Sequence, residues 1–304
     1  MSGSTRAGLV VGSHGRHVVV RCDDGQRVRC HLRSRRADAV VGDRVRWTPS
    51  GDEGVIEAVE PRRNLLFRQD AWRSKSFAAN LDALLILVAV EPPYAEAQLA
   101  RALIAAGSAG VPAWIALNKA DLPSLEAARQ RLRPYAAMGV EVVELSLKTR
   151  PTEAAEILRP RLAGRTTLIL GPSGMGKSTL VNRMVPGAQA AVGEISSALN
   201  SGRHTTTTTT WHALGAEPGA GALIDSPGFQ AFGLHHVAAA DLARLMPDLA
   251  AHTGGCRFAN CSHRHEPGCG VRAAAERGDI AASRLRLHAQ LYEELTGERP
   301  ASAQ

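Results

Sequence analysis

Residues 167–180 have the sequence TLILGPSGMGKSTL, and the predicted fold rests on this stretch. Its first four residues form a short apolar run, which predicts a buried strand. The spacing Gly-x-x-x-x-Gly-Lys-Ser that follows is that of a phosphate-binding loop, and the residues after it favour a helix. Because glycine allows positive φ, such a loop can point successive backbone N–H groups at one anion. The predicted phosphate-binding residues are Gly171, Pro172, Ser173, Gly174, Met175, Gly176, Lys177, Ser178 and Thr179.

Two side chains of this loop carry the predicted chemistry. Lys177 brings a positive charge to the β- and γ-phosphates of a nucleotide, so it is also a predicted catalytic residue. Ser178 offers its hydroxyl to Mg²⁺ at the start of a helix whose dipole favours the same anion. The alternative is a glycine-rich turn that matches by chance. The strand before the loop and the helix after it argue against that alternative.

The tetrapeptide Asn118-Lys119-Ala120-Asp121 follows an apolar run at residues 111–117. A carboxylate in the plane of a base can accept hydrogen bonds from the ring N–H and the exocyclic amine of guanine, and adenine offers no such pair. The motif is short and therefore weak alone. Its place after a predicted buried strand strengthens it, because α/β sheets bind ligands at the carboxyl ends of their strands. All four residues are predicted to contact a guanine nucleotide, with Asp121 selecting the base.

A third motif, Asp225-Ser226-Pro227-Gly228, follows the apolar run 222–224 and fits the pattern Asp-x-x-Gly. The Asp225 carboxylate is predicted to hold Mg²⁺ through a water molecule. The backbone N–H of Gly228 is predicted to reach the γ-phosphate.

A run of threonines occupies residues 205–210. One of Thr205–Thr207 is predicted to complete the Mg²⁺ shell, although the sequence does not say which one, and residues 208–210 predict an exposed strand. Phe229 stands where many signalling GTPases carry a glutamine that orients water, and a phenyl ring cannot do this. His204 is therefore a candidate catalytic residue, with a solvated loop histidine as the alternative.

The motifs come in an unusual order. A guanine-nucleotide domain normally begins with the phosphate-binding loop, whereas here Asn118–Asp121 precedes it. The residues at 146–148 stand where such domains place a loop behind the base, and this signal is poor alone. A circular permutation would assemble the usual sheet from the present order, and close chain termini make such a permutation possible. The strands that it moves ahead of the phosphate-binding loop are predicted at 81–90, 111–117 and 140–145.

The N-terminal residues alternate between apolar and polar side chains in several short segments. Residues 17–22 and 27–32 predict a hairpin, and further strands are predicted at 41–47 and 54–59. Four or five short strands in about 60 residues suit a small closed barrel such as the OB-fold, which often binds nucleic acid. The net charge of the chain is +7, and most of the excess lies before residue 76. This asymmetry indicates a polyanionic partner or, alternatively, a solvated arginine-rich surface.

The C-terminal stretch 256–269, CRFANCSHRHEPGC, concentrates three cysteines and two histidines. A set of three thiolates and one imidazole is a common four-coordinate site for structural Zn²⁺. His265 competes with His263 for the fourth position, and buried thiols without a metal are the alternative. A helix with leucines four residues apart is predicted at 279–295. The predicted ligands of one zinc ion per chain are Cys256, Cys261, His263 and Cys269.

Length and composition limit the class of protein. The 304 residues allow two or three domains. The longest apolar run lies between Asp82 and Glu91 and is too short to span a membrane, and no apolar secretory segment is evident. Five cysteines, an odd number, argue for a reducing compartment. We therefore expect a cytoplasmic monomer without a membrane partner. Its expected parts are an OB-like RNA-binding barrel over 1–65, a permuted α/β P-loop GTPase domain over 66–235, and a small helical zinc-binding domain over 236–304.

This order of motifs, joined to the spacing Cys-x4-Cys-x-His-x5-Cys, resembles the family of the ribosome small-subunit-dependent GTPase A. These are bacterial, circularly permuted GTPases that assist late maturation of the small ribosomal subunit. The resemblance covers nearly the whole chain. It implies GTP hydrolysis with Mg²⁺, stimulation by the small subunit, and rRNA contact through the barrel and the zinc module. It also implies that His263 is the zinc ligand and that His204 is catalytically important.

The chain departs from the family pattern in two details. Met175 replaces a smaller residue, and the threonine run is longer than the usual His-Thr-Thr-Thr. Two other functions fit parts of the chain. The first is a P-loop ATPase or small-molecule kinase, which differs by not selecting guanine through Asp121. The second is a zinc-dependent RNA-binding module whose nucleotide site is only structural, which differs by showing no turnover stimulated by small subunits.

Overall fold

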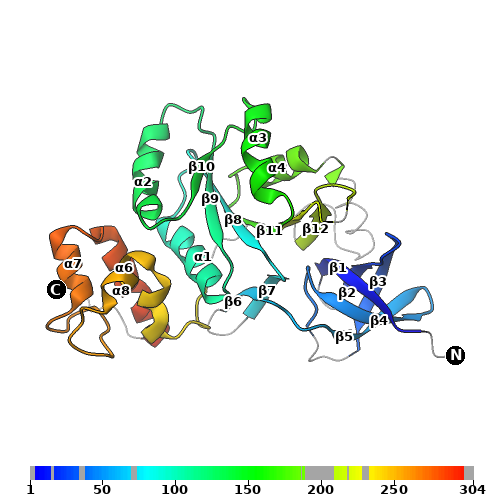
Figure 1. The fold of residues 1–304 in the computed structure, drawn as a ribbon, viewed down its shortest axis with the longest axis horizontal. Helices are drawn as coiled ribbons and strands as arrows, with labels where there is room; N and C mark the ends of the chain where they lie inside the picture. The colour runs from blue at the N-terminus through cyan, green and yellow to red at the C-terminus, as the bar shows by residue number, and fades with distance from the viewer. Residues whose placement is uncertain are drawn as a thin grey trace.

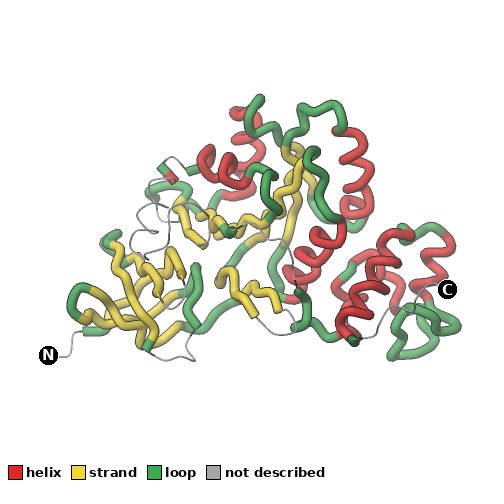
Figure 2. The backbone as a smooth tube through the Cα atoms, turned by 180° about the vertical axis from the view of Figure 1, so that it is seen from behind, coloured by secondary structure: helices red, strands yellow, loops and turns green. Residues whose placement is uncertain are grey.

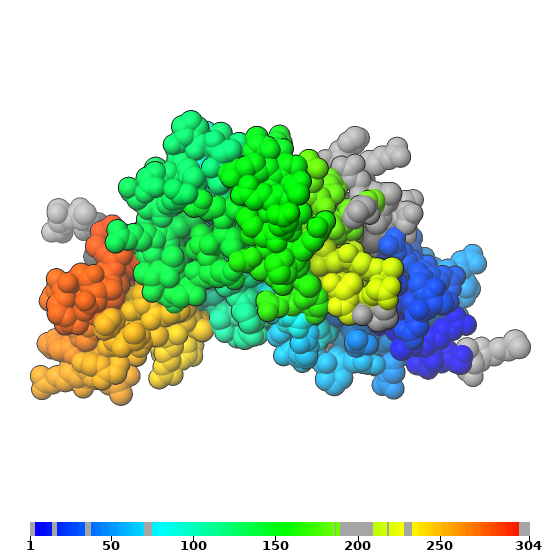
Figure 3. All heavy atoms as spheres, turned by 45° about the horizontal axis from the view of Figure 1, so that its top comes forward, coloured from blue at the N-terminus to red at the C-terminus, as the bar shows by residue number. Residues whose placement is uncertain are grey.

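The computed structural model describes residues 4–14, 17–33, 38–69, 74–185, 187–188, 209–217, 219–227 and 233–297. Its elements form three groups in a row, with N-terminal strands at one end, a sheet flanked by helices in the middle, and short C-terminal helices at the other end (Figure 1). The same order is visible from behind (Figure 2). The atoms of the first and last groups lie at opposite ends of the molecule (Figure 3).

The N-terminal group is a closed five-stranded barrel in which β1, β2, β3, β5 and β4 follow one another and β4 pairs back to β1. The predicted hairpin is confirmed, with Val18 opposite Cys30. The interior contains Val20, Cys30 and Trp47, all fully or almost fully buried, so the alternating pattern of the sequence does fill a core. The strands are β1 (Arg6–His14), β2 (His17–Arg21), β3 (Arg27–Leu32), β4 (Arg44–Ser50) and β5 (Glu53–Val59).

The central group is a sheet in the order β10-β9-β8-β11-β13-β12, with β12 antiparallel to β13 and the other pairs parallel. Every residue of β8 is buried, because helices cover both faces. Leu84 and Ile86 pack with α1 and α2, whereas Leu85 and Leu87 pack with α3 and α4. The elements are β8 (Ala83–Ala89), α1 (Glu96–Ser108), β9 (Ala113–Asn118), α2 (Leu125–Ala137), β10 (Val142–Glu144), α3 (Pro151–Leu162), β11 (Thr166–Leu170), α4 (Lys177–Met184), β12 (Thr209–Ala213) and β13 (Ala222–Asp225).

The position of β11 in this sheet reveals the permutation. β11, which leads into the phosphate-binding loop, pairs with β8 on one side and β13 on the other. The central strands that precede β11 in the chain all lie on the β8 side, and those that follow it lie on the β13 side. The sheet therefore combines the two halves of a P-loop domain in reversed chain order, as the motif order predicted.

Residues 61–80 are basic and lack a sustained periodicity, which predicts a linker, and this prediction is wrong. Most of the segment is an antiparallel hairpin made of β6 (Leu65–Gln69) and β7 (Ser74–Ala79). Leu66, Phe77 and Ala78 are buried in the large core that also contains α1 residues. The many basic side chains make the average composition of the segment polar, so its few apolar residues did not indicate a strand. The partner that buries them comes from later in the chain.

The free edge of β6 binds the segment that follows the Asp-x-x-Gly motif. The N–H of Gln69 donates to the carbonyl of Gly233 at 3.1 Å, and the N–H of His235 donates to the carbonyl of Gln69 at 2.9 Å. The rings of Phe67 and His236 lie beside this bridge with centroids 4.4 Å apart. The hairpin thus connects the first part of the chain to the residues leading into the C-terminal group.

The C-terminal group contains short helices that share a core with α1 and α2. The helix predicted at 279–295 is present, and its Leu287 and Leu291 are buried. No helix in the described part of the chain combines the length and apolar character needed to cross a membrane. The elements are the 3₁₀ helix η1 (Ala239–Leu245), α6 (Pro247–Thr253), α7 (Gly270–Arg277) and α8 (Ala282–Thr296).

The strand β12 corrects a second prediction. Thr209 and Thr210 were expected in an exposed strand, but they are 7% and 1% exposed. They are buried because β12 pairs with β13 on one edge and with β1 of the barrel on the other. In the described residues this joins barrel and central strands into one eleven-stranded sheet. The domain limits at residues 65 and 235 stay predictions.

Candidate active site

A cavity of about 870 Å³ lies at the carboxyl ends of the central strands. Loops that follow β9, β10, β11 and β13 line it, so segments far apart in the sequence meet there. Its lining consists of Asn118, Lys119, Asp121, Leu122, Leu147, Lys148, Thr149, Ser173, Gly174, Gly176, Lys177, Ser178, Thr179, Asp225, Ser226 and Pro227.

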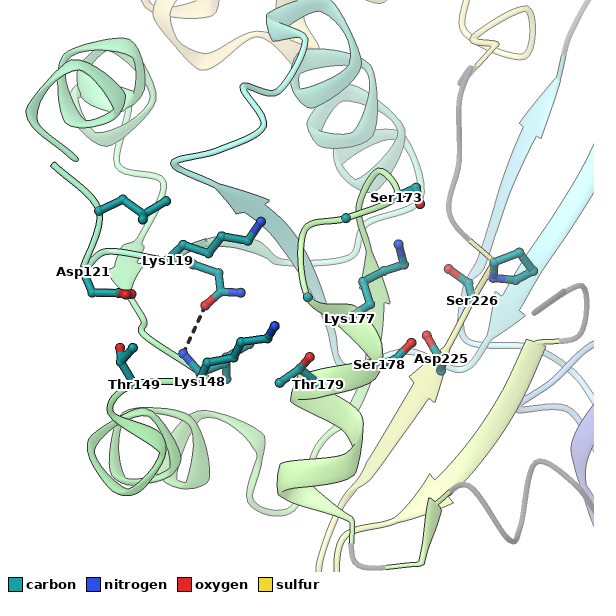
Figure 4. A pocket seen from close by; sticks show the side chains of 16 residues that line it. Lys119, Asp121, Lys148, Thr149, Ser173, Lys177, Ser178, Thr179, Asp225 and Ser226 are labelled. Carbon is teal, nitrogen blue, oxygen red and sulfur yellow. Dashed lines mark hydrogen bonds between the residues drawn. The ribbon is translucent and has the colours of Figure 1, made fainter. Parts of the chain in front are cut away.

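The two principal motifs occupy different ends of this cavity. Figure 4 shows Lys119 and Asp121 on one side, and Lys177, Ser178 and Asp225 on the other. A ligand with a base at one end and phosphates at the other fits this division of side chains. The arrangement brings together what the chain presents in reversed order.

At two positions of the phosphate-binding loop, neighbouring atoms lie too close to the backbone for any residue but glycine. A Cβ on Gly171 would lie 2.3 Å from the carbonyl oxygen of Leu87. A Cβ on Gly176 would lie 2.4 Å from Nδ2 of Asn118, and the φ of Gly176 is +104°. Only glycine therefore lets the loop curl against β8 and against the Asn118 side chain.

Lys177 lies inside this loop and is partly buried. Its Nζ donates to the carbonyl oxygens of Gly171 at 2.7 Å and Pro172 at 2.8 Å. Burial lowers the pKa of Lys177, and the nearby Asp225 carboxylate opposes this shift. The ammonium group is thus held at the centre of the loop, where an anion would lie.

Asn118 joins three of the loops. Its Nδ2 donates to the carbonyl of Met175 at 2.8 Å, and its Oδ1 accepts from the N–H of Leu147 at 3.2 Å. Both groups are buried, so the amide has a fixed orientation. The next residue, Lys119, has a φ of +62°, in the left-handed region that costs about 1 kcal/mol or more for a non-glycine residue. Such strain at a ligand cavity is typical of a binding loop.

Asp225 is a buried carboxylate at the phosphate end of the cavity, with 7% of its surface exposed. Its Oδ1 has no hydrogen-bond partner among the described residues. Burial raises the pKa of Asp225 to about 6, and the charge of Lys177 opposes the shift. An unsatisfied carboxylate oxygen beside the Ser178 hydroxyl is a donor set that suits a hard cation such as Mg²⁺. The chemistry of these residues therefore fits that ion.

Not all of the predicted site residues line the cavity. Ala120, Gly171, Pro172 and Met175 shape the loops without lining the cavity. His204, Thr205–Thr208 and Gly228 lie outside the described residues. Leu122 and Thr149 line the base end of the cavity but belong to none of the predicted motifs. Their only signal was proximity to the predicted 118–121 and 146–148 loops.

The C-terminal cysteines and one histidine form a compact cluster. The ligand atoms of Cys256, Cys261, His263 and Cys269 all lie within 4.8 Å of one another. Nδ1 of His263 is 3.4 Å from the sulfurs of both Cys256 and Cys269. His265 is exposed and lies outside the cluster. Three sulfurs and one imidazole nitrogen at this separation could hold a metal ion.

The class follows from the order of the strands around the cavity: this is a circularly permuted GTPase. The family model described as RsgA GTPase matches residues 59–235. The curated "Small ribosomal subunit biogenesis GTPase RsgA" of Variovorax paradoxus (strain S110) is 55% identical over 297 residues, which cover 96% of this chain and 93% of that one. The chain belongs to the RsgA GTPase family.

Other relatives and solved structures extend the similarity. The protein of the same name from Bordetella pertussis is 54% identical over 302 residues, 99% of this chain and all of that one. The crystal structure of YjeQ from Thermotoga maritima is similar with a TM-score of 0.71 and 30% identity, over 97% of this chain and 100% of that one. YloQ, described as a circularly permuted GTPase, has the same fold with a TM-score of 0.70 and 21% identity over 98% and 97%.

Proposed function

We propose that this chain hydrolyses GTP to GDP and phosphate in the cavity described above, and that it does so in late maturation of the small ribosomal subunit. The observation that carries the proposal is that Asp121 and Lys177 line different ends of one cavity. Its relatives are named small ribosomal subunit biogenesis GTPases, which supports the choice of partner.

In this proposal the base end of the cavity selects guanine. The Asp121 carboxylate accepts from the ring N–H and the exocyclic amine of the base. The Lys119 stem lies along one face of the base, with Asn118 and Ala120 completing the loop. Asn118 is already engaged with Met175 and Leu147, so its role is to hold the base loop against the phosphate loop.

At the phosphate end, Lys177 exchanges its two backbone carbonyl partners for phosphate oxygens. Backbone N–H groups of the loop after Pro172 would point at the same anion and stabilise charge that develops during hydrolysis. Ser178 and Asp225 would hold Mg²⁺, which neutralises charge on the β- and γ-phosphates when bound. Gly228, one threonine of 205–207 and His204 complete the proposed machinery on sequence grounds.

The flanking parts of the chain would provide the contacts with rRNA. We propose an RNA-binding barrel over 1–65, a GTPase domain over 66–235 and a zinc domain over 236–304. Arg44 and Arg46 are exposed on β4 and could meet phosphates. One Zn²⁺ at the Cys256 cluster would stabilise the C-terminal part, because α6 and α7, the helices on either side of the cluster, are too short to be stable alone. A monomer in the cytoplasm suits this role.

The base specificity can be tested with Asp121→Asn. The amide presents a donor where guanine also presents a donor, so GDP affinity should fall about 100-fold while xanthosine diphosphate affinity rises. Glu126→Gln, an exposed carboxylate on the nearby α2, is the matched control and should change neither affinity. An unchanged preference in Asp121→Asn, or ATP binding as tight as GTP binding, would contradict the guanine assignment.

The partner can be tested by measuring phosphate release with purified ribosomal subunits. Small subunits should raise the GTP turnover at least about tenfold, whereas large subunits should not. Cosedimentation with small subunits in the presence of a GTP analogue, and its loss with GDP, would support a nucleotide-dependent cycle. Equal turnover with and without small subunits would favour an RNA-binding protein with a structural nucleotide site.

A further inference from the structure

The strand β12 lies between the proposed magnesium carboxylate and the barrel. In the antiparallel pairing of β1 with β12, Gly12 lies opposite Thr210. In the pairing of β12 with β13, the same Thr210 lies opposite Asp225. Gly12, Thr210 and Asp225 therefore form one row across three strands. Because β12 pairs with both neighbouring strands, a displacement of Asp225 can reach the barrel through this one strand.

The side chains at this junction form a small apolar contact. Trp211 packs against Val11 and Val19, which face away from the barrel interior and are nevertheless 1% and 2% exposed. The guanidinium of Arg21 lies 4.3 Å from the centroid of the Trp211 ring. A cation held over an indole attracts the ring, and more strongly where water is excluded. This contact buries Val19, whereas its neighbours Val18 and Val20 face the barrel interior.

The junction is narrow compared with the bodies that it joins. Among the described residues, β1 and β12 share two registered pairs, Gly12 with Thr210 and Ser13 with Thr209. The barrel has a second attachment, where the N–H of Ala79 donates to the carbonyl of Val41 at 2.9 Å. The two attachments come from different strands, so the barrel is held at two separate places.

We propose that β12 couples the Asp225 end of the nucleotide cavity to the orientation of the barrel, so that RNA bound to the barrel controls GTP hydrolysis. The proposal rests on the GTPase function proposed above. Coupling of this kind is reciprocal for binding: if the nucleotide state changes barrel orientation, then RNA on the barrel changes nucleotide affinity by the same factor. Arg21 and Trp211 act here as positioning residues that keep β1 on β12.

Hydrogen exchange tests the coupling directly in the full-length, unmodified chain. Exchange in peptides covering residues 9–13 of β1 should differ between the GDP and GTP-analogue states, because β12 lies between them and Asp225. Peptides of β5, which pairs with β3 and β4 and not with β12, are the internal control and should not differ. Identical exchange at 9–13 in both states would overturn the proposal.

A pair of arginine variants tests the consequence for activity. Arg21→Ala removes the cation over Trp211, and Arg6→Ala removes the cation 5.6 Å from the ring centroid of Trp47 inside the barrel. Arg21→Ala should keep basal hydrolysis but lose about fivefold or more of the stimulated rate, and its cosedimentation with small subunits should differ less between the GTP-analogue and GDP states. Arg6→Ala should change none of these properties. A conservative Arg21→Lys should recover part of the stimulation.

The possible outcomes separate this inference from the function on which it rests. If small subunits stimulate the wild type and Arg21→Ala equally, the coupling through β12 is wrong and the proposed GTPase function stands. If Arg21→Ala weakens cosedimentation equally in the GTP-analogue and GDP states, Arg21 is an RNA contact and the coupling is again wrong. If the wild type itself shows no stimulation, the proposed function fails, and the coupling fails with it.

Discussion

Asp225 is buried without a partner for its Oδ1 atom among the described residues. A carboxylate in this position is unfavourable when charged, and the charge of Lys177 offsets only part of the cost. The burial becomes useful when a cation is present, because an oxygen without a competing hydrogen bond is ready to accept it. The raised pKa of Asp225 therefore indicates a carboxylate that binds a ligand and not one with a purely structural role.

This burial predicts a pH dependence of stability. The pKa of Asp225 rises from 3.8 to about 6 on folding, so its stabilising contribution is complete below about pH 4 and is lost as the pH rises through 6. The loss is about 3 kcal/mol at most. Asp225→Asn stays neutral and should not lose it. Urea unfolding of both proteins, without nucleotide or Mg²⁺, should show stabilities that diverge between pH 4.5 and 7.5.

Parallel pH curves for the two proteins would contradict the raised pKa of Asp225. Because other groups titrate in both proteins, the quantity to compare is the difference in unfolding free energy at each pH. Adding Mg²⁺ and GDP to the wild type should reduce the divergence, since a bound cation stabilises the ionised carboxylate.

Gly176 is constrained by its neighbour as well as by its backbone. Gly176→Ala would place a Cβ 2.4 Å from Nδ2 of Asn118, in addition to the cost of about 1 kcal/mol for alanine at positive φ. Gly139→Ala is the matched control, because Gly139 also has a positive φ of +83° but nothing lies within 4 Å of the added Cβ. Both variants should lose stability, whereas only Gly176→Ala should lose GDP affinity, by more than about tenfold. Equal GDP affinities, measured by calorimetry, would show that Asn118 moves aside without consequence.

The C-terminal helices α6 and α7 are short, with 7 and 8 residues. Helices of this length are marginal alone, so the loop between them depends on other constraints. The four clustered ligands Cys256, Cys261, His263 and Cys269 supply such a constraint when a metal ion is bound. The backbone N–H groups of Ser262 and Arg264 donate to the carboxylate of Glu266 at 2.7 and 3.2 Å, which orders the loop that carries His263.

Metal removal should therefore loosen this part of the chain selectively. Treatment with a zinc chelator, or the substitution Cys261→Ser, should raise hydrogen exchange across α6 and α7 and leave that of β8 and β9 unchanged. Cys22→Ser is the matched control, since Cys22 is a cysteine outside the cluster. Elemental analysis of the untreated protein should give about one zinc per chain. Protein purified without any bound metal and with protected α6 and α7 would contradict the assignment.

The C-terminal group shares a core with the central helices and contains a buried ion pair next to them. Arg284 on α8 donates to Asp248 on α6 at 2.8 and 3.1 Å. The same guanidinium lies 5.0 Å from the ring centroid of Tyr135 on α2. On the neighbouring helix α1, Arg101 pairs with Glu294 of α8. These contacts fix the C-terminal group relative to the helices that follow the nucleotide-binding strands.

Breaking this pair should weaken the whole molecule. Asp248→Ala leaves the almost fully buried Arg284 without its carboxylate, so the free energy of unfolding should fall by about 3 kcal/mol. The double variant Asp248→Leu with Arg284→Met should recover most of this, because no buried charge remains. Asp279→Ala, which breaks an exposed pair with Arg277, is the control and should change stability by less than about 0.5 kcal/mol. Equal effects of Asp248→Ala and Asp279→Ala on chemical unfolding would show that stability does not depend on the buried pair.

Several elements were predictable because their signals are local. The unbroken apolar run of β8 predicts a strand covered on both faces, and the glycine spacing after β11 predicts a loop that needs positive φ. The metal cluster was predictable for the same reason, since its four ligands lie within one short stretch. Spacing alone left His263 and His265 as alternatives. The structure includes Nδ1 of His263 in the cluster and leaves His265 in solvent.

Other features depend on partners that are distant in the chain. Residues 65–79 form a hairpin because α1 and the segment after β13 bury and extend it, and no local pattern names those partners. Thr210 is buried for a similar reason, since β1 and β13 pair with its two edges. Local spacing and periodicity were thus enough to identify the strands, the phosphate loop and the metal ligands. The tertiary structure alone determined which strands became neighbours and how Asp225 is linked to the barrel. The reason is that strands pair through backbone hydrogen bonds, which every sequence can form, so neither strand identifies its partner.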